Sequence, residues 1–382
     1  MKNTINKTDV TLILTSIFVI IGGCVLSNIS LSYGFLLCIF LSFILFIKKG
    51  FSFKELFHMI TKGLGECKIL YLLILLIGAT VSIWMSSGIV PSMIYYGFEY
   101  LRGVNFLFAA FLIMSISAVF MGTAIGTLST IGIAVLGIGT GFSIPSNILL
   151  GVIVSGAFIA DKISPISGLL NLTLSTTNTR YSKALKSMAA TLIPAFIITS
   201  FLYYLLGIKY SGNIDIFRIR EFQHSIKDVF FISPYLLLIP FAIVIMSLFG
   251  IKIIYSLLMG LFCGIIISFN LQKFTFIQIL KYIIWGYRGN TPSAKLNGIL
   301  ISGGMVSMIE VLLIVMGAIA LSSILEGTKV IHFLTDKVIS NIKNERELIL
   351  KTGIISCILT IVTCDQTMGI VLPARDFALE NF

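Results

Sequence analysis

The sequence predicts an all-α, polytopic membrane protein with about ten to eleven transmembrane segments. Hydrophobic residues make up 57% of its 382 residues and charged residues only 11%, whereas soluble proteins carry about 25% charged residues. No charged residue or histidine stands between Arg102 and Asp161, a run of 58 residues. One helix crosses the hydrocarbon layer with about 20 residues, so this run must enter the membrane more than once.

Apolar stretches recur along the whole chain. The first, at 11–27, has no small-x-small cleavage site after it and is interpreted as a retained span rather than a signal peptide. The stretch at 127–141 is short and rich in glycine, which favours a re-entrant piece. The remaining predicted segments are 31–47, 69–87, 105–121, 147–160, 185–206, 233–250, 251–269, 305–324 and 348–364.

The stretch Phe120–Asn171 is expected to hold the functional site. Its apolar sequence is interrupted by Gly122, Gly126, Gly132, Gly137, Gly139, Gly141 and Pro145, and it carries Thr123, Thr127, Ser129, Thr130, Thr140 and Ser143. Backbone released from helical pairing persists at membrane depth only where protein buries it or where it lines a wet cavity. Broken helices rich in hydroxyl groups therefore predict an ion or solute site.

An internal duplication predicts two inverted repeats. Phe51–Leu56 (FSFKEL) recurs as Phe274–Ile279 (FTFIQI), 223 residues later, and Leu76–Ala79 recurs as Val315–Ala318, 239 residues later. The change in offset predicts an insertion around Trp285–Gly298. Paired broken helices in two repeats form midplane sites in secondary transporters.

The register of this duplication sets the expected organisation. It places the Gly122–Thr123 break opposite the segment Thr363–Gln366. The expected parts are a first membrane repeat at 1–210, a connecting loop at 211–232 and a second membrane repeat at 233–382. The second repeat has no counterpart to the last segments of the first, so we expect it to be incomplete.

Asp365 is the first candidate ion-binding residue, because it stands in a segment that is apolar on both sides. A carboxylate near the bilayer centre is costly and persists mainly where it is paired, hydrated or used. It would be a cation ligand or proton carrier, with Gln366 beside it. The alternative is a loop residue just after a span that ends at Val362.

Asp161 is the second candidate, with Ser164, Ser167 and Asn171 after it as neutral oxygen donors. Hard cations prefer oxygen ligands of this kind, and a carboxylate that binds either a cation or a proton couples the two by exclusion. The alternative is a helix-end charge pair of Asp161 with Lys162 at the headgroup level.

Other polar residues leave two interpretations open. The hydroxyls of Thr123, Thr127 and Thr130 are candidate ligands, but hydroxyls also hold helices together in membranes. Glu310 is a candidate coupling residue or an interfacial residue near a helix start. Lys162 is a candidate coupling residue that would act as a structural counter-ion or anchor a substrate carboxylate.

Several function classes are disfavoured. His58, His224 and His332 lie in no HExxH motif, and no GxSxG motif occurs, so no enzyme is expected. The net charge of +11 is attributed to Lys and Arg at span ends, so no nucleic acid partner is expected. No cofactor is expected beyond transported Na⁺ and H⁺, and the expected partners are the lipid bilayer and these ions or a small organic anion. A homodimer is a candidate assembly.

The motifs of the site resemble those of the NhaC-type sodium/proton antiporters of the ion transporter superfamily. The resemblance covers most of the chain from about residue 50 onward. It is carried by Gly122-Thr123-x-x-Gly126-Thr127-x-x-Thr130-x-Gly132, Gly137-Ile138-Gly139, Ser155-Gly156-Ala157-Phe158-x-x-Asp161-Lys162-x-Ser164-Pro165-x-Ser167-x-x-Asn171, Asp365-Gln366 and Ile370-Val371-Leu372-Pro373-x-Arg375. It implies exchange of Na⁺ against H⁺, or of organic anions as in malate/lactate-exchanging relatives.

The sequence departs from this family in two places. The family usually has Asp-Thr-Thr after the position of Ser167, and this chain has Gly168, Leu169 and Leu170. The family also continues beyond the position of Arg375 into further helices. These departures imply weaker cation coordination, a different substrate or a lost site.

Three hypotheses follow for function. The leading one is a multi-pass antiporter of the cytoplasmic membrane that exchanges Na⁺ for H⁺. Asp161 and Asp365 would be its titrating carboxylates, and the oxygen donors named above its neutral ligands. The second is a Na⁺- or H⁺-coupled transporter of a small organic acid or amino acid. The third is a truncated, non-transporting relative that binds a partner protein.

Overall fold

The computed structural model describes residues 6–211, 216–331, 344–363 and 366–378. Across these residues the regular structure is helical, apart from one isolated β-bridge between Arg288 and Ile301, which confirms the predicted all-α class. The chain forms two compact units, each discontinuous in sequence. Unit 1 comprises Met1–Leu72, Leu172–Asn178 and Ile309–Phe382; unit 2 comprises Leu73–Asn171 and Thr179–Met308.

The polytopic membrane prediction is confirmed by helix length and composition. Within the described residues, eight helical segments are long and apolar enough to cross a membrane, or nine if a bent pair counts as one span. That pair, Ile216–Val229 and Pro234–Leu248, bends by 92°. The eight are Thr8–Leu26, Leu31–Lys48, Lys68–Ser86, Ala124–Gly141, Ser146–Thr176, Tyr181–Tyr210, Ile253–Asn270 and Gly304–Gly327.

The count is lower than ten to eleven because some predicted segments form shorter helices. The apolar run at 105–121 forms α6, Phe106–Met121, whose 16 residues end at Gly122. The run at 127–141 was expected to be re-entrant. Together with the residues just before it, this run forms one helical segment, Ala124–Gly141, that is long enough to cross the membrane.

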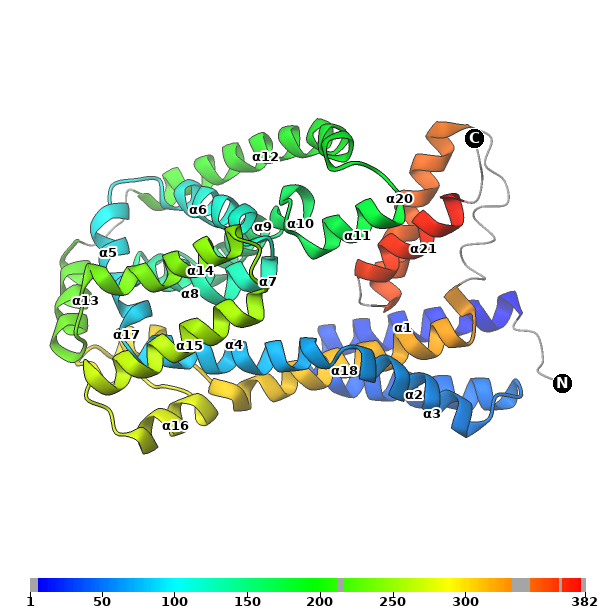
Figure 1. The fold of residues 1–382 in the computed structure, drawn as a ribbon, viewed down its shortest axis with the longest axis horizontal. Helices are drawn as coiled ribbons and strands as arrows, with labels where there is room; N and C mark the ends of the chain where they lie inside the picture. The colour runs from blue at the N-terminus through cyan, green and yellow to red at the C-terminus, as the bar shows by residue number, and fades with distance from the viewer. Residues whose placement is uncertain (1–5, 212–215, 332–343, 364–365, 379–382) are drawn as a thin grey trace. The chain divides into compact units, whose positions relative to one another are not determined.

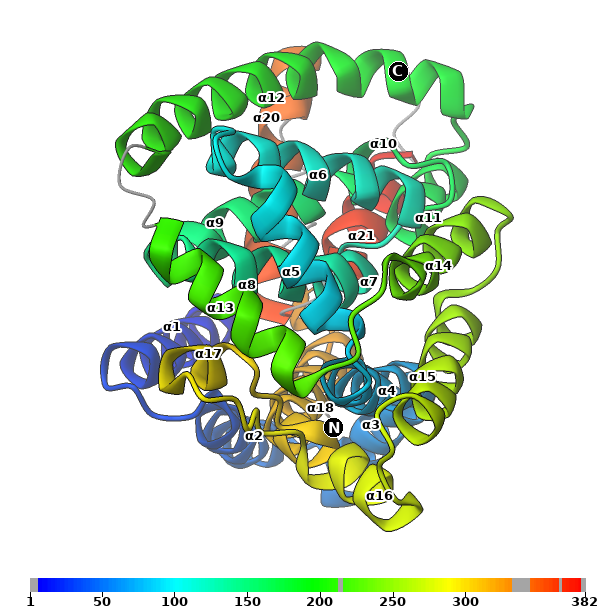
Figure 2. The same cartoon turned by 90° about the vertical axis from the view of Figure 1, so that its left-hand side faces the viewer.

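Unit 2 carries the stretch predicted to be functional (Figures 1 and 2). Its α6 packs against α9 and α12, and α8 packs between α5 and α9. The elements are most of α4 (Lys68–Ser86), α5 (Ile89–Leu101), α6, α7 (Ala124–Thr127), η1 (Leu128–Gly132), α8 (Ile133–Gly141), α9 (Ser146–Ala157), α10 (Ala160–Ile163), the start of α11 (Gly168–Thr176), α12 (Tyr181–Ser211), α13 (Ile216–Val229), η2 (Pro234–Leu237), α14 (Leu238–Leu248), α15 (Ile253–Asn270), α16 (Phe276–Trp285), α17 (Ala294–Ile299) and the first residues of α18 (Gly304–Gly327).

A close helix crossing fixes α9 against α6. A Cβ added at Gly156 of α9 would lie 2.6 Å from the Cβ of Met114 and 3.2 Å from the carbonyl oxygen of Phe111, both on α6. Small residues let helix backbones approach in membranes, where van der Waals packing drives association. Gly156 therefore brings the two helices into contact and positions the chain that follows α9.

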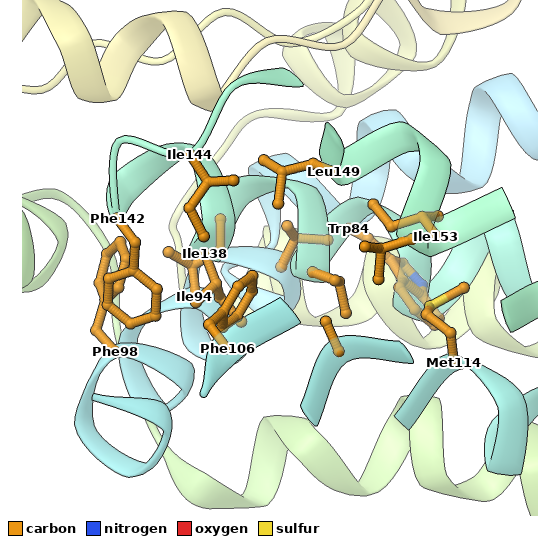
Figure 3. Packing of buried hydrophobic residues seen from close by; sticks show 14 of the residues in the cluster. Trp84, Ile94, Phe98, Phe106, Met114, Ile138, Phe142, Ile144, Leu149 and Ile153 are labelled. Carbon is orange, nitrogen blue, oxygen red and sulfur yellow. The ribbon is translucent and has the colours of Figure 1, made fainter. Parts of the chain in front are cut away.

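Large buried side chains fill the interior of unit 2 (Figure 3). The ring of Phe142 lies 5.5 Å from that of Phe98 and 5.1 Å from that of Phe106, centroid to centroid. Trp84, which is 1% exposed, donates its indole N–H to the carbonyl of Gly260 over 3.0 Å. This well-packed interior supports the broken helix segment.

Unit 1 contains α1 (Lys7–Leu26), α2 (Leu31–Lys48), α3 (Phe53–Glu66), most of α18, α20 (Glu345–Thr363) and α21 (Gln366–Ala378). Its helices also meet at small residues. Gly63 of α3 lies against Ser323 of α18, Gly317 of α18 against Phe35 of α2, and Gly369 of α21 against Thr360 of α20.

The two copies of the duplicated hexapeptide have the same local structure. Ser52 and Glu55 form a capping box at the start of α3, and Thr275 and Gln278 form one at the start of α16. The residue after each box, Leu56 or Ile279, is the buried anchor of its helix. These matches agree with the offset of 223 residues. The division into repeats at 1–210 and 233–382 remains a prediction.

Candidate functional site

The predicted helix break at Gly122–Thr123 is present. The α6 helix ends at Gly122, whose φ of +66° lies in the left-handed region that favours glycine. Thr123 is extended, with φ −150° and ψ 129°, and α7 begins after it. The π-helical η1 follows directly, and such π-helical segments are frequent at functional sites.

Hydroxyl groups from two other segments donate hydrogen bonds to carbonyls at the end of α6 that have no partner within the helix. Ser164 donates to the carbonyl of Val119 over 2.7 Å, and Ser247 of α14 donates to the carbonyl of Met121 over 2.7 Å. Both serines are buried. Each carbonyl oxygen keeps a second lone pair, and the C-terminal end of a helix carries partial negative charge. The end of α6 is therefore a favourable place for a cation.

Asp161 lies on the short helix α10 and is partly buried. The hydroxyl of Ser167, which is fully buried, lies 3.4 Å from its Oδ1. The loop between them is held in place by Asn171, whose side-chain N–H groups donate to the carbonyls of Pro165 (3.0 Å) and Ser167 (2.9 Å). Tyr181 supports α10 by donating to the carbonyl of Ile163 over 2.7 Å.

This loop packs directly on the helix break. A Cβ added at Gly122 would lie 3.2 Å from the backbone carbonyl carbon of Ile166 and would meet its side chain as well. Together with the Ser164–Val119 hydrogen bond, this contact brings Asp161, Ser164 and Ser167 to the end of α6. The structure thus joins the two halves of the predicted stretch.

The threonines after the break gather around Met121. The hydroxyls of Thr127 and Thr130 lie 3.7 Å and 3.6 Å from its sulfur. Their hydrogen bonds go to the carbonyls of Thr123 (2.9 Å) and Gly126 (2.8 Å) within the same segment. Both are buried, so these hydroxyls stabilise the irregular backbone of α7 and η1.

The remaining predicted residues fall elsewhere. Lys162 is exposed beside Asp161. Glu310 is exposed on α18, and Gln366 is partly buried at the start of α21; both belong to unit 1. Asp365 lies outside the described residues, between the end of α20 at Thr363 and the start of α21 at Gln366.

Two contributors were not anticipated from the sequence. Ser247 is the single hydroxyl residue in the apolar sequence from Leu236 to Gly250, and this isolation is the signal that could have identified it. Tyr181 stands at the start of α12 and carries no comparable signal.

The arrangement joins a partly buried carboxylate, buried hydroxyls and backbone carbonyls at a helix terminus. These are the hard oxygen donors that hard cations prefer. Among the described residues no group of three or more His, Cys, Asp or Glu side chains could hold a metal ion. An all-α, multi-pass membrane protein with a carboxylate at a broken helix has the architecture of a transporter.

Comparison with known proteins also identifies the chain as a transporter. The sequence profile of the Na⁺/H⁺ antiporter family matches residues 156–378, and the chain belongs to that family. It is therefore a membrane transporter that exchanges Na⁺ for H⁺, and not an enzyme. No solved structure matches it.

Relatives with three different named activities share about the same identity with the chain. The malate-2H⁺/Na⁺-lactate antiporter of Bacillus subtilis is 28% identical over 88% of this chain and 72% of its own. The Na⁺/H⁺ antiporter NhaC of Alkalihalophilus pseudofirmus is 29% identical over 80% of this chain and 66% of its own. The arginine/ornithine antiporter ArcD of Halobacterium salinarum is 28% identical over 86% and 68%.

Proposed function

We propose that Asp161 is the carboxylate that binds Na⁺ and H⁺ in turn during exchange. The observation that carries this proposal is its position: its loop packs on the Gly122 break, and the buried Ser167 hydroxyl lies 3.4 Å from its Oδ1. A carboxylate beside the negative end of α6 attracts a cation. A proton on Asp161 removes its charge and one lone pair, so the two ions exclude each other.

The neutral ligands of the proposed site are Ser164, Ser167 and Thr123. The Ser164 hydroxyl donates a hydrogen bond to the Val119 carbonyl, so the lone pairs of the hydroxyl oxygen can face a cation. Thr123, in the extended link of the break, adds a hydroxyl. We assign Thr127, Thr130 and Asn171 a supporting role, because their shortest hydrogen bonds, of 2.8–3.0 Å, go to backbone carbonyls within this region.

The predicted repeats extend the proposal to the second half of the chain. In their register, Asp365 and Gln366 stand opposite the Gly122–Thr123 break. We propose them as the counterpart of this site, with Glu310 and Lys162 as candidate coupling residues. Each of these roles rests on the sequence register and on residue type.

Competition at one carboxylate makes the apparent KM for Na⁺ depend on pH. Below the pKa of the Asp161 carboxyl, each further unit of acidity lowers its unprotonated fraction about tenfold. We therefore expect the KM for Na⁺ to rise about tenfold per pH unit in that range, while kcat changes little. Initial rates of ²²Na⁺ uptake into proteoliposomes across a pH series measure both values. A KM that stays constant while kcat falls would place the proton on another group.

A second candidate function is exchange of an organic solute. Two of the similar proteins are named as a malate-2H⁺/Na⁺-lactate antiporter and an arginine/ornithine antiporter. In addition, Gly168 and Leu169 stand where NhaC-type sequences usually have Asp and Thr, and a Cβ at Gly168 would meet open space. Uptake of labelled malate, lactate or arginine that saturates and needs Na⁺ would support this candidate.

A further inference from the structure

The short helix α16 cannot cross a membrane. Its 10 residues, Phe276–Trp285, extend about 15 Å at 1.5 Å per residue, against a hydrocarbon layer of about 30 Å. It follows α15, which is long and apolar enough to span, and the capping box at Thr275 starts it soon after α15 ends. The α16 helix therefore begins near the level at which α15 leaves the membrane.

The surface of α16 is divided into distinct faces. Ile279 is buried inside unit 2, whereas Ile277, Leu280 and Ile284 are exposed at helical spacing. Gln278 and Lys281 are exposed on the remaining arc. An apolar stripe beside a polar one is the pattern of a helix that lies in the plane of the membrane interface.

Trp285 ends α16 and is 63% exposed. Tryptophan is enriched at membrane–water interfaces, because its ring is apolar and its N–H is polar. Its position at the end of α16 agrees with a helix at headgroup depth.

All charged residues in the sequence on either side of α16, from Val229 to Ile309, are basic. No acidic residue stands between Asp228 and Glu310. Four cations follow the end of α15, and all four are exposed: Lys273, Lys281, Arg288 and Lys295. Exposed basic residues attract anionic lipid headgroups, with a gain of about fivefold in affinity for each basic residue near the membrane surface.

We infer that α16 is an interfacial helix that binds anionic phospholipid headgroups. Ile277, Leu280 and Ile284 contact the upper part of the acyl chains, and Lys273 and Lys281 contact lipid phosphates. This surface is separate from the Asp161 site and does not depend on the proposed function. The α3 helix shares the capping box but carries acidic residues, Glu55 and Glu66, so the inference is restricted to α16.

The two tryptophans of the chain allow a depth measurement. Trp84 is 1% exposed and Trp285 63% exposed, so lipid-borne quenchers reach Trp285. The full chain is reconstituted in phosphatidylcholine vesicles with bromine at shallow, middle or deep acyl positions. We expect the shallow bromines to quench most strongly, and Trp285→Phe to remove this quenching. Maximal quenching by deep bromines, or none at any depth, would overturn the interfacial position.

Headgroup selectivity is tested in the same vesicles. At equal mole fraction, shallow-brominated phosphatidylglycerol is expected to quench Trp285 several-fold more than shallow-brominated phosphatidylcholine. The double variant Lys273→Gln/Lys281→Gln should lose this preference. Lys252→Gln is the matched control, because Lys252 is an exposed lysine at the opposite end of α15, and it should keep the preference. Equal quenching by both lipids in the unmodified protein would contradict binding of anionic headgroups.

Discussion

Replacing Asp161 with asparagine is expected to abolish Na⁺-dependent collapse of a pH gradient in everted membrane vesicles. Asparagine keeps the size of the side chain but removes its negative charge and its ability to carry a proton. A unit charge about 4 Å from a cation contributes about 4 kcal/mol at an effective dielectric constant of 20. That energy corresponds to about a thousandfold in Na⁺ affinity, so transport at millimolar Na⁺ should fall to background.

An exposed lysine outside the proposed site gives the control for this substitution. Lys183 is exposed on α12 and is neither a proposed ligand nor a proposed coupling residue, so Lys183→Gln should leave most of the exchange intact. Equal amounts of each variant in the membrane must be established, for example by fluorescence of a fused reporter. Wild-type exchange in Asp161→Asn vesicles would remove Asp161 from the site.

Replacing Gly122 with alanine is expected to impair both transport and folding. The φ of +66° at this position costs a non-glycine residue on the order of 1–3 kcal/mol. The new methyl group would also press on Ile166 and displace the loop that carries Ser164 and Ser167. Exchange rate and the thermal unfolding midpoint in detergent measure the two effects.

Alanine variants of two other glycines separate the effect of backbone strain from the effect of the contact with Ile166. Gly103 has a φ of +86° and no atom within 4 Å of an added Cβ, so Gly103→Ala adds backbone strain alone. Gly168 has neither a positive φ nor a close neighbour, so its alanine variant should behave like the unmodified protein. If Gly122→Ala loses no more exchange than Gly103→Ala, the contact with Ile166 has no role in transport.

The fold class and the helix break could be predicted because both depend on local sequence. Low charge and long apolar runs require membrane burial, and Gly122 supplies the conformation that ends α6. The number of spanning helices was less predictable. Apolar runs of similar appearance gave helices of different length, and α6 stops after 16 residues.

The candidate site was predictable in composition but not in geometry. Asp161 and Ser167 are six residues apart, and their proximity depends on a loop that Asn171 and Tyr181 hold. The hydrogen bond from Ser247 to Met121 joins residues 126 apart in sequence, and no local pattern could reveal it. Likewise, each compact unit takes segments from both predicted repeats, because packing depends on helix contacts rather than on chain order.

Proton release on Na⁺ binding tests most directly whether Asp161 binds both ions. Purified protein in weakly buffered detergent solution is titrated with NaCl while a dissolved indicator reports pH, with choline chloride as the control for ionic strength. Near the pKa of the site, the unmodified protein should release protons as Na⁺ binds, and Asp161→Asn should release none. Na⁺ binding without proton release in the unmodified protein, or equal release from the variant, would contradict exchange at Asp161.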